Sequence, residues 1–192
     1  IGNGVRIVGE YAFYNCSALE SLTIPDSVVN IGDRVFSECA SLSVVTIGSG
    51  LTGIGASAFS YCSSLTEVVI PDNVTDIKAE AFSCCGLVSV TVGKGVKIVG
   101  PWFSGCSGLT NVTMHDGVTE IWSDAFAGCG ALKNMVIPNS VMNIGDYTFY
   151  QCTGLTNLVI GNSVTNIGEC SFFNCCGLTN VTIPDGVASI GR

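Results

Sequence analysis

Apolar residues recur along the chain with a period of 22 or 23 residues. One phenylalanine marks each period, at Phe13, Phe36, Phe59, Phe82, Phe103, Phe126, Phe149 and Phe172. A cysteine follows three residues later, at Cys16, Cys39, Cys62, Cys85, Cys106, Cys129, Cys152 and Cys175, and then a leucine, at Leu19, Leu42, Leu65, Leu87, Leu109, Leu132, Leu155 and Leu178. Such a period is typical of a solenoid, in which each repeat buries its apolar side chains against its neighbours.

The repeats divide the chain into eight coils and part of a ninth. The coils run over residues 1–23, 24–46, 47–69, 70–91, 92–113, 114–136, 137–159 and 160–182, and the partial coil over 183–192. The fourth coil is one residue short around Cys84 and Cys85, and the fifth around Pro101 and Trp102. A deletion is tolerated in a turn, so we expect both on the convex side, with local irregularity between about Lys78 and Phe103.

Each coil contains the same succession of elements, illustrated by the second. The alternating apolar positions of residues 19–24 predict a short strand with one buried face. Pro-Asp at 25–26 predicts a turn, and residues 28–31 supply two more inward side chains. A tight bend starts at residue 32, where Asp33 is a candidate cap for one short helical turn. We therefore expect an α/β repeat, mostly β, with one parallel sheet on the concave face.

The consensus L-x-x-L-x-I-P-x-x-V-x-x-I-G-x-x-A-F-x-x-C resembles the BspA-like class of leucine-rich repeats, as in LESLTIPDSVVNIGDRVFSEC and LTNVTIPDGVASIG. The resemblance covers the whole chain and departs at the two short coils, at Trp102 and at Trp122. It implies a cell-surface or secreted protein of bacteria or protists that adheres to proteins or to other cells. The class has no catalytic signature to transfer, so we expect no enzyme and no cofactor.

The net charge of the chain limits the classes of partner that it can bind. The net charge is −8, from 15 acidic and 7 basic residues, and no basic cluster exists to displace counterions from a phosphate backbone. We therefore expect no nucleic-acid partner. No stretch approaches the length of a membrane-spanning helix, so we expect no membrane span in this segment.

The eleven cysteines form a ladder of eight, with Cys84, Cys170 and Cys176 off it. Neighbouring ladder cysteines are near enough for disulfides, but a ladder cannot pair every member with both neighbours. We interpret the ladder as buried free thiols, with scattered disulfides as the alternative. Because zinc needs ligands converging on one point, we expect no metal site.

The surface of the predicted sheet is the main candidate binding face. Its outward residues are Glu20, Ser21, Thr23, Thr66, Glu67, Thr110, Asn111, Thr113, Lys133, Asn134, Thr156, Asn157, Thr179, Asn180 and Thr182. The four asparagines stack in register from the fifth coil onwards. They form either a hydrogen-bonded ladder along the sheet or part of a polar, nearly uncharged platform for protein or glycan.

Two further groups of residues are candidates. Trp102 and Trp122, in neighbouring coils, form either a convex interface patch or plugs for the space left by the deletion, and we favour the plugs. Four glycosylation sequons place candidate acceptors at Asn15, Asn73, Asn111 and Asn180.

The sequence shows no polar cap at either end, which we interpret as a segment of a longer array. Two functions follow as hypotheses. The first is an extracellular or cell-surface module that binds protein or glycan through the sheet face. The second is a structural element that stacks on itself end to end into a filament.

Overall fold

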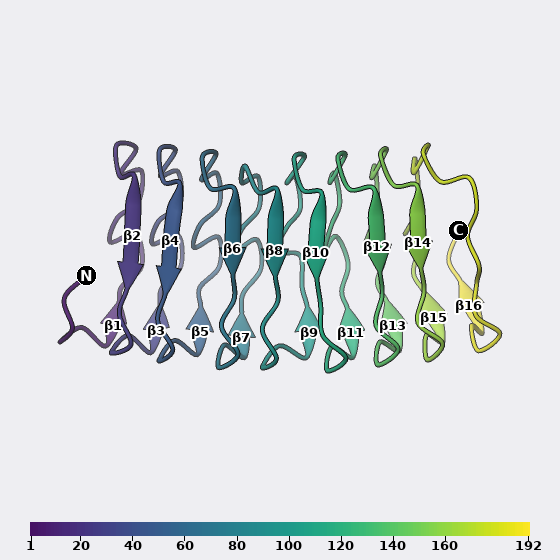
Figure 1. The fold of residues 1–192 in the computed structure, drawn as a ribbon, viewed down its shortest axis with the longest axis horizontal. Coiled ribbons are helices and arrows are strands. Elements are labelled where there is room, and N and C mark those ends of the chain that lie inside the picture. Colours follow the sequence, from purple (N-terminus) through teal and green to yellow (C-terminus); the bar gives the residue numbers. More distant parts are fainter.

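The computed structural model describes residues 1–192 and shows a parallel β-solenoid of about eight turns that contains no helix. In Figure 1 the coils stand side by side along a nearly straight axis, with the two termini at opposite ends of the rod. No helix is present that could cross a membrane. The expected solenoid is confirmed.

The longer strand of each coil lies on the expected face, which we call the long-strand face. These strands are β2 (Ser21–Ile24), β4 (Val44–Ile47), β6 (Glu67–Val69), β8 (Ser89–Thr91), β10 (Asn111–Thr113), β12 (Asn134–Val136) and β14 (Asn157–Val159). Within the groups β2–β4, β6–β8–β10 and β12–β14, neighbours pair in parallel with a shift of one repeat, as in Leu22 opposite Val45 and Met135 opposite Leu158. No strand pairing joins β4 to β6 or β10 to β12. Alternate side chains enter the core, which fixes the register because a slip by one residue would expose them.

A second ladder of two-residue strands lies on another side, which we call the short-strand face. Its strands are β1 (Ile7–Val8), β3 (Asn30–Ile31), β5 (Gly53–Ile54), β7 (Asp76–Ile77), β9 (Ile98–Val99), β11 (Glu120–Ile121), β13 (Asn143–Ile144), β15 (Asn166–Ile167) and β16 (Ser189–Ile190). The expectation of a single sheet was incomplete, because two extended residues per coil suffice to bond the next coil. This ladder is continuous except between β7 and β9, where no pairing occurs.

The expected helical turn is wrong. We call the five residues centred on each core phenylalanine, such as 34–38, the turn wall. Arg34 and Glu38 lie in the left-handed region, with φ of 51° and 63°. The N–H groups of Arg34, Phe36 and Glu38 therefore all face the next coil and donate to its carbonyls at 2.8–2.9 Å. A helix would need these bonds within the coil.

The core is built from the predicted rows. Phenylalanine rings of successive coils stack with centroids 5.3–5.9 Å apart. Six of these rings, from Phe36 to Phe149, are fully buried. The ladder cysteines close the coil beside them: the Cys152 thiol donates to the carbonyl of Phe126 at 3.2 Å, and Cys106 to that of Phe82 at 3.1 Å.

Candidate functional site

All fifteen residues predicted for the sheet face are exposed on the long-strand face. The strands bring them together because each outward position repeats in register from coil to coil, as Asn134 does opposite Asn157. This surface therefore exists as a single face along the rod, as Figure 1 shows for its strands.

Hydrogen bonds on this face support the asparagine ladder at one step only. Asn157 Nδ2 donates to Asn134 Oδ1 at 2.7 Å. Asn180 instead donates to the hydroxyl of Thr179, at 3.3 Å, and Asn111 makes no side-chain hydrogen bond. Thr110 and Thr156 donate to main-chain carbonyls of the preceding coil, at 3.1 and 3.0 Å. Several of the predicted binding residues thus also hold neighbouring coils together.

The long-strand face is more apolar than the predicted polar platform. Exposed valines stand among the threonines and asparagines, with exposures of 44–63%, at Val44, Val69, Val88, Val136 and Val159. The alternation of inward and outward residues along the strands predicts that these valines point outward. They were not among the predicted binding residues, because only polar residues were considered as binding candidates. The face is therefore a mixed surface of short side chains.

A second polar ladder, absent from the sequence predictions, runs along the short-strand face. Asn166 Nδ2 donates to Asn143 Oδ1 at 2.8 Å, and Ser189 Oγ donates to Asn166 Oδ1 at 2.8 Å. The register of β13, β15 and β16 aligns these three residues. The signal in the sequence was the Asn-Ile pair that precedes the bend at 30–31, 143–144 and 166–167.

Both deletions fall outside the long strands, as expected. In the regular coils, the leucine N–H bonds the carbonyl of the ladder cysteine, as Leu65 does to Cys62 at 3.1 Å. The fourth coil has one residue less between Cys85 and Leu87, and this bond is missing there.

The deletion in the fifth coil comes with a change of backbone conformation. Pro101 occupies the position, two residues before the core phenylalanine, that is left-handed in the other seven coils. The proline ring holds φ near about −65°, so this conformation is not accessible. A short turn replaces it, in which the Trp102 N–H donates to the Gly100 carbonyl at 2.7 Å.

The two tryptophans do not form the exposed patch that was one hypothesis. Trp102 is 4% exposed and packs edge to face against Phe103, with centroids 6.1 Å apart. It occupies a position held by alanine, valine, threonine or serine in other coils, and its burial is that expected of a plug. Trp122 is 49% exposed, and its Nε1 donates to Glu120 Oε2 at 2.8 Å. The hypothesis of a plug is therefore wrong for Trp122.

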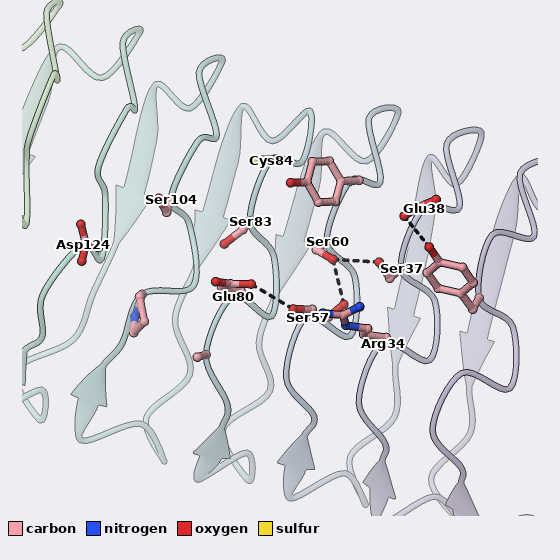
Figure 2. Close-up of a pocket in the computed structure, with 14 residues that line it drawn as sticks. Arg34, Ser37, Glu38, Ser57, Ser60, Glu80, Ser83, Cys84, Ser104 and Asp124 are labelled. Atoms are coloured by element: carbon pink, nitrogen blue, oxygen red, sulfur yellow. Dashed lines mark hydrogen bonds between the residues drawn. The ribbon is translucent and has the colours of Figure 1, made fainter.

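A shallow groove of about 500 Å³ runs along the turn wall of coils two to six (Figure 2). Serines that directly follow the core phenylalanines line it, and Ser37 and Ser60 share a hydrogen bond of 2.9 Å. Ser57 donates to Glu80 at 3.2 Å, and Tyr14 to Glu38 at 2.6 Å. These six side chains are thus paired with one another, whereas the buried Ser83 hydroxyl of the groove has no hydrogen-bond partner.

The cysteines are all unpaired in this structure. Burial raises the pKa of the Cys106 and Cys152 thiols to about 12. Cys16, Cys84 and Cys176 are exposed. No group of three metal-ligating side chains occurs in the chain.

Three of the four sequon asparagines, Asn15, Asn111 and Asn180, have exposed side chains. The fourth, Asn73, is half-buried, and its Nδ2 donates to the carbonyl of Leu51. Since Nδ2 is the atom that would carry a glycan, the structure favours the other three as acceptors.

The comparison with known families agrees with the fold. A family model described as "BspA type Leucine rich repeat region" matches residues 1–102 and 97–192, with six copies of the repeat. The chain belongs to the BspA-type leucine-rich repeat family. The resemblance drawn from the repeat consensus is thereby confirmed.

Solved structures of bacterial members of this repeat class share the fold. A leucine-rich repeat protein from Bacteroides ovatus is 30% identical, with a TM-score of 0.89, over 97% of this chain and 49% of that chain. A Treponema pallidum leucine-rich repeat protein is 30% identical, with a TM-score of 0.64, over 92% of this chain and 72% of that one. This chain therefore spans about half the length of the Bacteroides protein. A search of curated protein sequences gives no match.

A third similar structure is that of a cell surface protein. It is a leucine-rich cell surface protein from Faecalibacterium prausnitzii, 27% identical, with a TM-score of 0.58. The match covers 97% of this chain and 73% of that one.

Proposed function

We propose that this chain is a non-enzymatic recognition module at the cell surface or outside the cell, which binds protein or glycan through the long-strand face. The location draws support from the similar cell surface protein of Faecalibacterium prausnitzii. The binding role draws support from family membership and from the character of this one face.

The observation that carries the proposal is the composition of the long-strand face. Its outward positions hold mainly threonine, valine and asparagine, with few charges. Such side chains are short, and those of threonine and valine are also stiff at χ1, so they lose little rotamer entropy when a partner covers them. A mixed face of methyl, hydroxyl and amide groups can bury apolar area and still form hydrogen bonds.

The proposal is tested by surface plasmon resonance on mucin glycoprotein, before and after removal of its glycans. The double variant Val136→Glu/Val159→Glu places two charges on the exposed face without touching the core. Because carboxylates are costly to desolvate, we expect binding to weaken at least about tenfold, since each step of 1.4 kcal/mol is tenfold in affinity.

Met142→Glu provides the matched control, because Met142 is 51% exposed beside the short-strand face. It should leave mucin binding unchanged. If both variants bind mucin as the parent does, the long-strand face is not the binding surface. Loss of binding after deglycosylation would assign glycan as the ligand, and retained binding would assign protein.

End-to-end stacking into a filament is a second candidate function. It is favoured because the hydrogen bonds between coils repeat in the same direction along the rod. Turn-wall N–H groups point one way along the rod in every coil, as from Phe13 to Val35 and from Phe149 to Ser171. Copies stacked head to tail would continue this pattern, whereas copies stacked head to head would oppose like groups. Electron microscopy of the purified chain should then show filaments with the coil spacing kept across subunits. Uniform short rods at high concentration would contradict stacking.

A further inference from the structure

The short-strand ladder is broken at one place, between β7 and β9. Elsewhere along this face, each coil donates two N–H groups to the coil before it, as Thr75 does to Thr52 at 3.0 Å and Lys78 to Ile54 at 2.9 Å. At the break, the N–H groups of Lys97 and Gly100 donate to no carbonyl. Figure 1 shows β7 and β9 further apart than other neighbouring short strands, while β6, β8 and β10 remain evenly spaced.

The unpaired groups at the break include acceptors as well as donors. The carbonyls of Thr75 and Ile77 accept no hydrogen bond, although the matching carbonyls of Thr52 and Ile54 both accept main-chain hydrogen bonds from the next coil. Main-chain groups left without a protein partner need water or a ligand. Both sides of the break thus offer hydrogen-bonding groups in fixed positions.

A cavity of about 380 Å³ occupies this break. Thr75 and Ile77 line one side and Lys97 and Gly100 the other, so the four residues with unpaired main-chain groups all face it. Ile77 is half-buried, whereas its counterparts Ile54 and Ile121 are buried. The cavity therefore opens the core edge that is closed in other coils.

Both tryptophans of the chain line this cavity. Trp122 contributes a half-exposed indole, held by its hydrogen bond to Glu120. The indole N–H of Trp102 donates no hydrogen bond within the protein and lies close beside Gly100. An aromatic face and a free N–H donor are therefore present at the same site.

The charge around the cavity is locally basic in an acidic protein. Lys78, Lys94 and Lys97 are three of only seven basic residues in the chain, and Lys78 and Lys97 line the cavity. Asp76, the acid that lines the cavity, is paired with Lys78 at 3.0 Å. Lys97 forms no salt bridge, and its exposed side chain holds its ammonium near Gly117 of the sixth coil, so pairing with a ligand in the cavity needs a change of side-chain rotamer. Lys97 therefore has a charge available for an anionic ligand.

We propose that this cavity binds a carboxylate-bearing pyranose, such as a uronic acid residue of a glycan. The apolar face of the sugar stacks on Trp122, its carboxylate pairs with Lys97, and its hydroxyls bond the free main-chain groups and the Trp102 indole. A ligand of this class matches the combination of donors, acceptors, aromatic surface and positive charge. The site lies on a different face from the one used by the proposed function and does not depend on it.

The experiment uses intrinsic fluorescence, because the only two tryptophans both line the cavity. The full chain is titrated with sodium glucuronate, with glucose as the neutral sugar and with acetate as the carboxylate alone. We expect a saturable change of tryptophan emission with glucuronate, and at least about tenfold weaker responses to glucose and acetate, because each lacks one half of the recognition.

Two variants complete the test. Lys97→Gln removes the charge and should weaken the response to glucuronate at least about tenfold. Arg6→Gln removes a positive charge from the equivalent position of the first coil, directly before β1, and should leave the response unchanged. The absence of a saturable response to glucuronate, an equal response to glucose, or an unaltered response in Lys97→Gln would each overturn the proposal. Saturable binding of an unstructured threonine-rich peptide, without binding of glucuronate, would also overturn the proposal. The peptide would then form an additional β-strand between β7 and β9, hydrogen-bonded to their unpaired main-chain groups.

Discussion

At the scale of single residues, the ladder cysteines act as buried hydrogen-bond donors. Every ladder thiol except that of Cys16 bridges two coils by donating to a phenylalanine carbonyl of the preceding coil, as Cys39 does to Phe13 at 3.3 Å. The same position must also be small and apolar enough for the core, and cysteine satisfies both demands. Burial holds the thiols protonated by raising the pKa of Cys106 and Cys152 from 9.0 to about 12.

This pKa shift predicts a loss of stability at alkaline pH. In the unfolded chain these thiols ionise near pH 9, whereas in the fold they stay protonated up to about pH 12. Their contribution is therefore complete below pH 9 and is lost as the pH rises towards 12, because the unfolded state then binds fewer protons. Urea unfolding between pH 8 and 11 should show the free energy of unfolding falling with pH.

The control is the double variant Cys106→Ala/Cys152→Ala, which lacks the two shifted groups. Its free energy of unfolding should fall less steeply with pH than that of the parent. Equal slopes would show that other groups, such as tyrosines and lysines, cause the alkaline loss.

At the scale of elements, the turn wall depends on left-handed residues that are mostly not glycine. Thirteen non-glycine residues have positive φ, and Gly105 and Gly128 occupy two equivalent positions. A left-handed conformation costs a non-glycine residue about 1–2 kcal/mol. The wall tolerates this cost because only this conformation directs three N–H groups of each coil to the next.

Gln151→Gly should therefore stabilise the chain. Gln151 has a φ of 58° and no side-chain hydrogen bond, and it aligns with Gly105 and Gly128. Relief of left-handed strain, less the greater entropy lost by glycine on folding, gives an expected gain of about 0.5–1 kcal/mol. Urea unfolding measures it. Thr153→Gly, two residues on and without positive φ, should instead lower the stability, and a loss in both variants would contradict the role of strain.

At the scale of the whole molecule, one shortened coil divides a regular rod. The long strands β6, β8 and β10 continue past it, whereas the short-strand ladder stops at β7 and starts again at β9. Pro101 and the missing residue act together, because they prevent the left-handed turn that would return the fifth coil to its neighbour. The cavity forms because the fourth and fifth coils are paired on the long-strand face but separated on the short-strand face.

Restoring a regular coil should close the break. The variant replaces Gly100–Trp102 with the four residues Gly-Ala-Ser-Ala that stand at 55–58 in the third coil. We expect β7 and β9 to pair, so that hydrogen exchange at Lys97 and the restored glycine slows to the level seen at Thr52 and Gly55. The remaining Trp122 should then show no response to glucuronate. Unchanged exchange would mean that the missing residue does not cause the break.

The repeat consensus was sufficient to predict the solenoid and the phenylalanine, cysteine and leucine rows of its core. It could do so because strand alternation and core burial depend on residue type alone, repeated eight times in register. The burial of Trp102 was also foreseen, since a large apolar residue beside a deletion has space to fill.

The sequence by itself therefore determined which side chains form the core and which face carries the longer strands. Only the tertiary structure decided the left-handed turn wall and the second ladder. The shortened coils predicted an irregularity between about Lys78 and Phe103, but only the tertiary structure showed that it is a break between β7 and β9. Residues such as Arg34 and Gln151 have no intrinsic preference for positive φ, and that conformation exists because hydrogen bonds to the next coil select it. The break likewise depends on the relative positions of two coils, which no single repeat encodes.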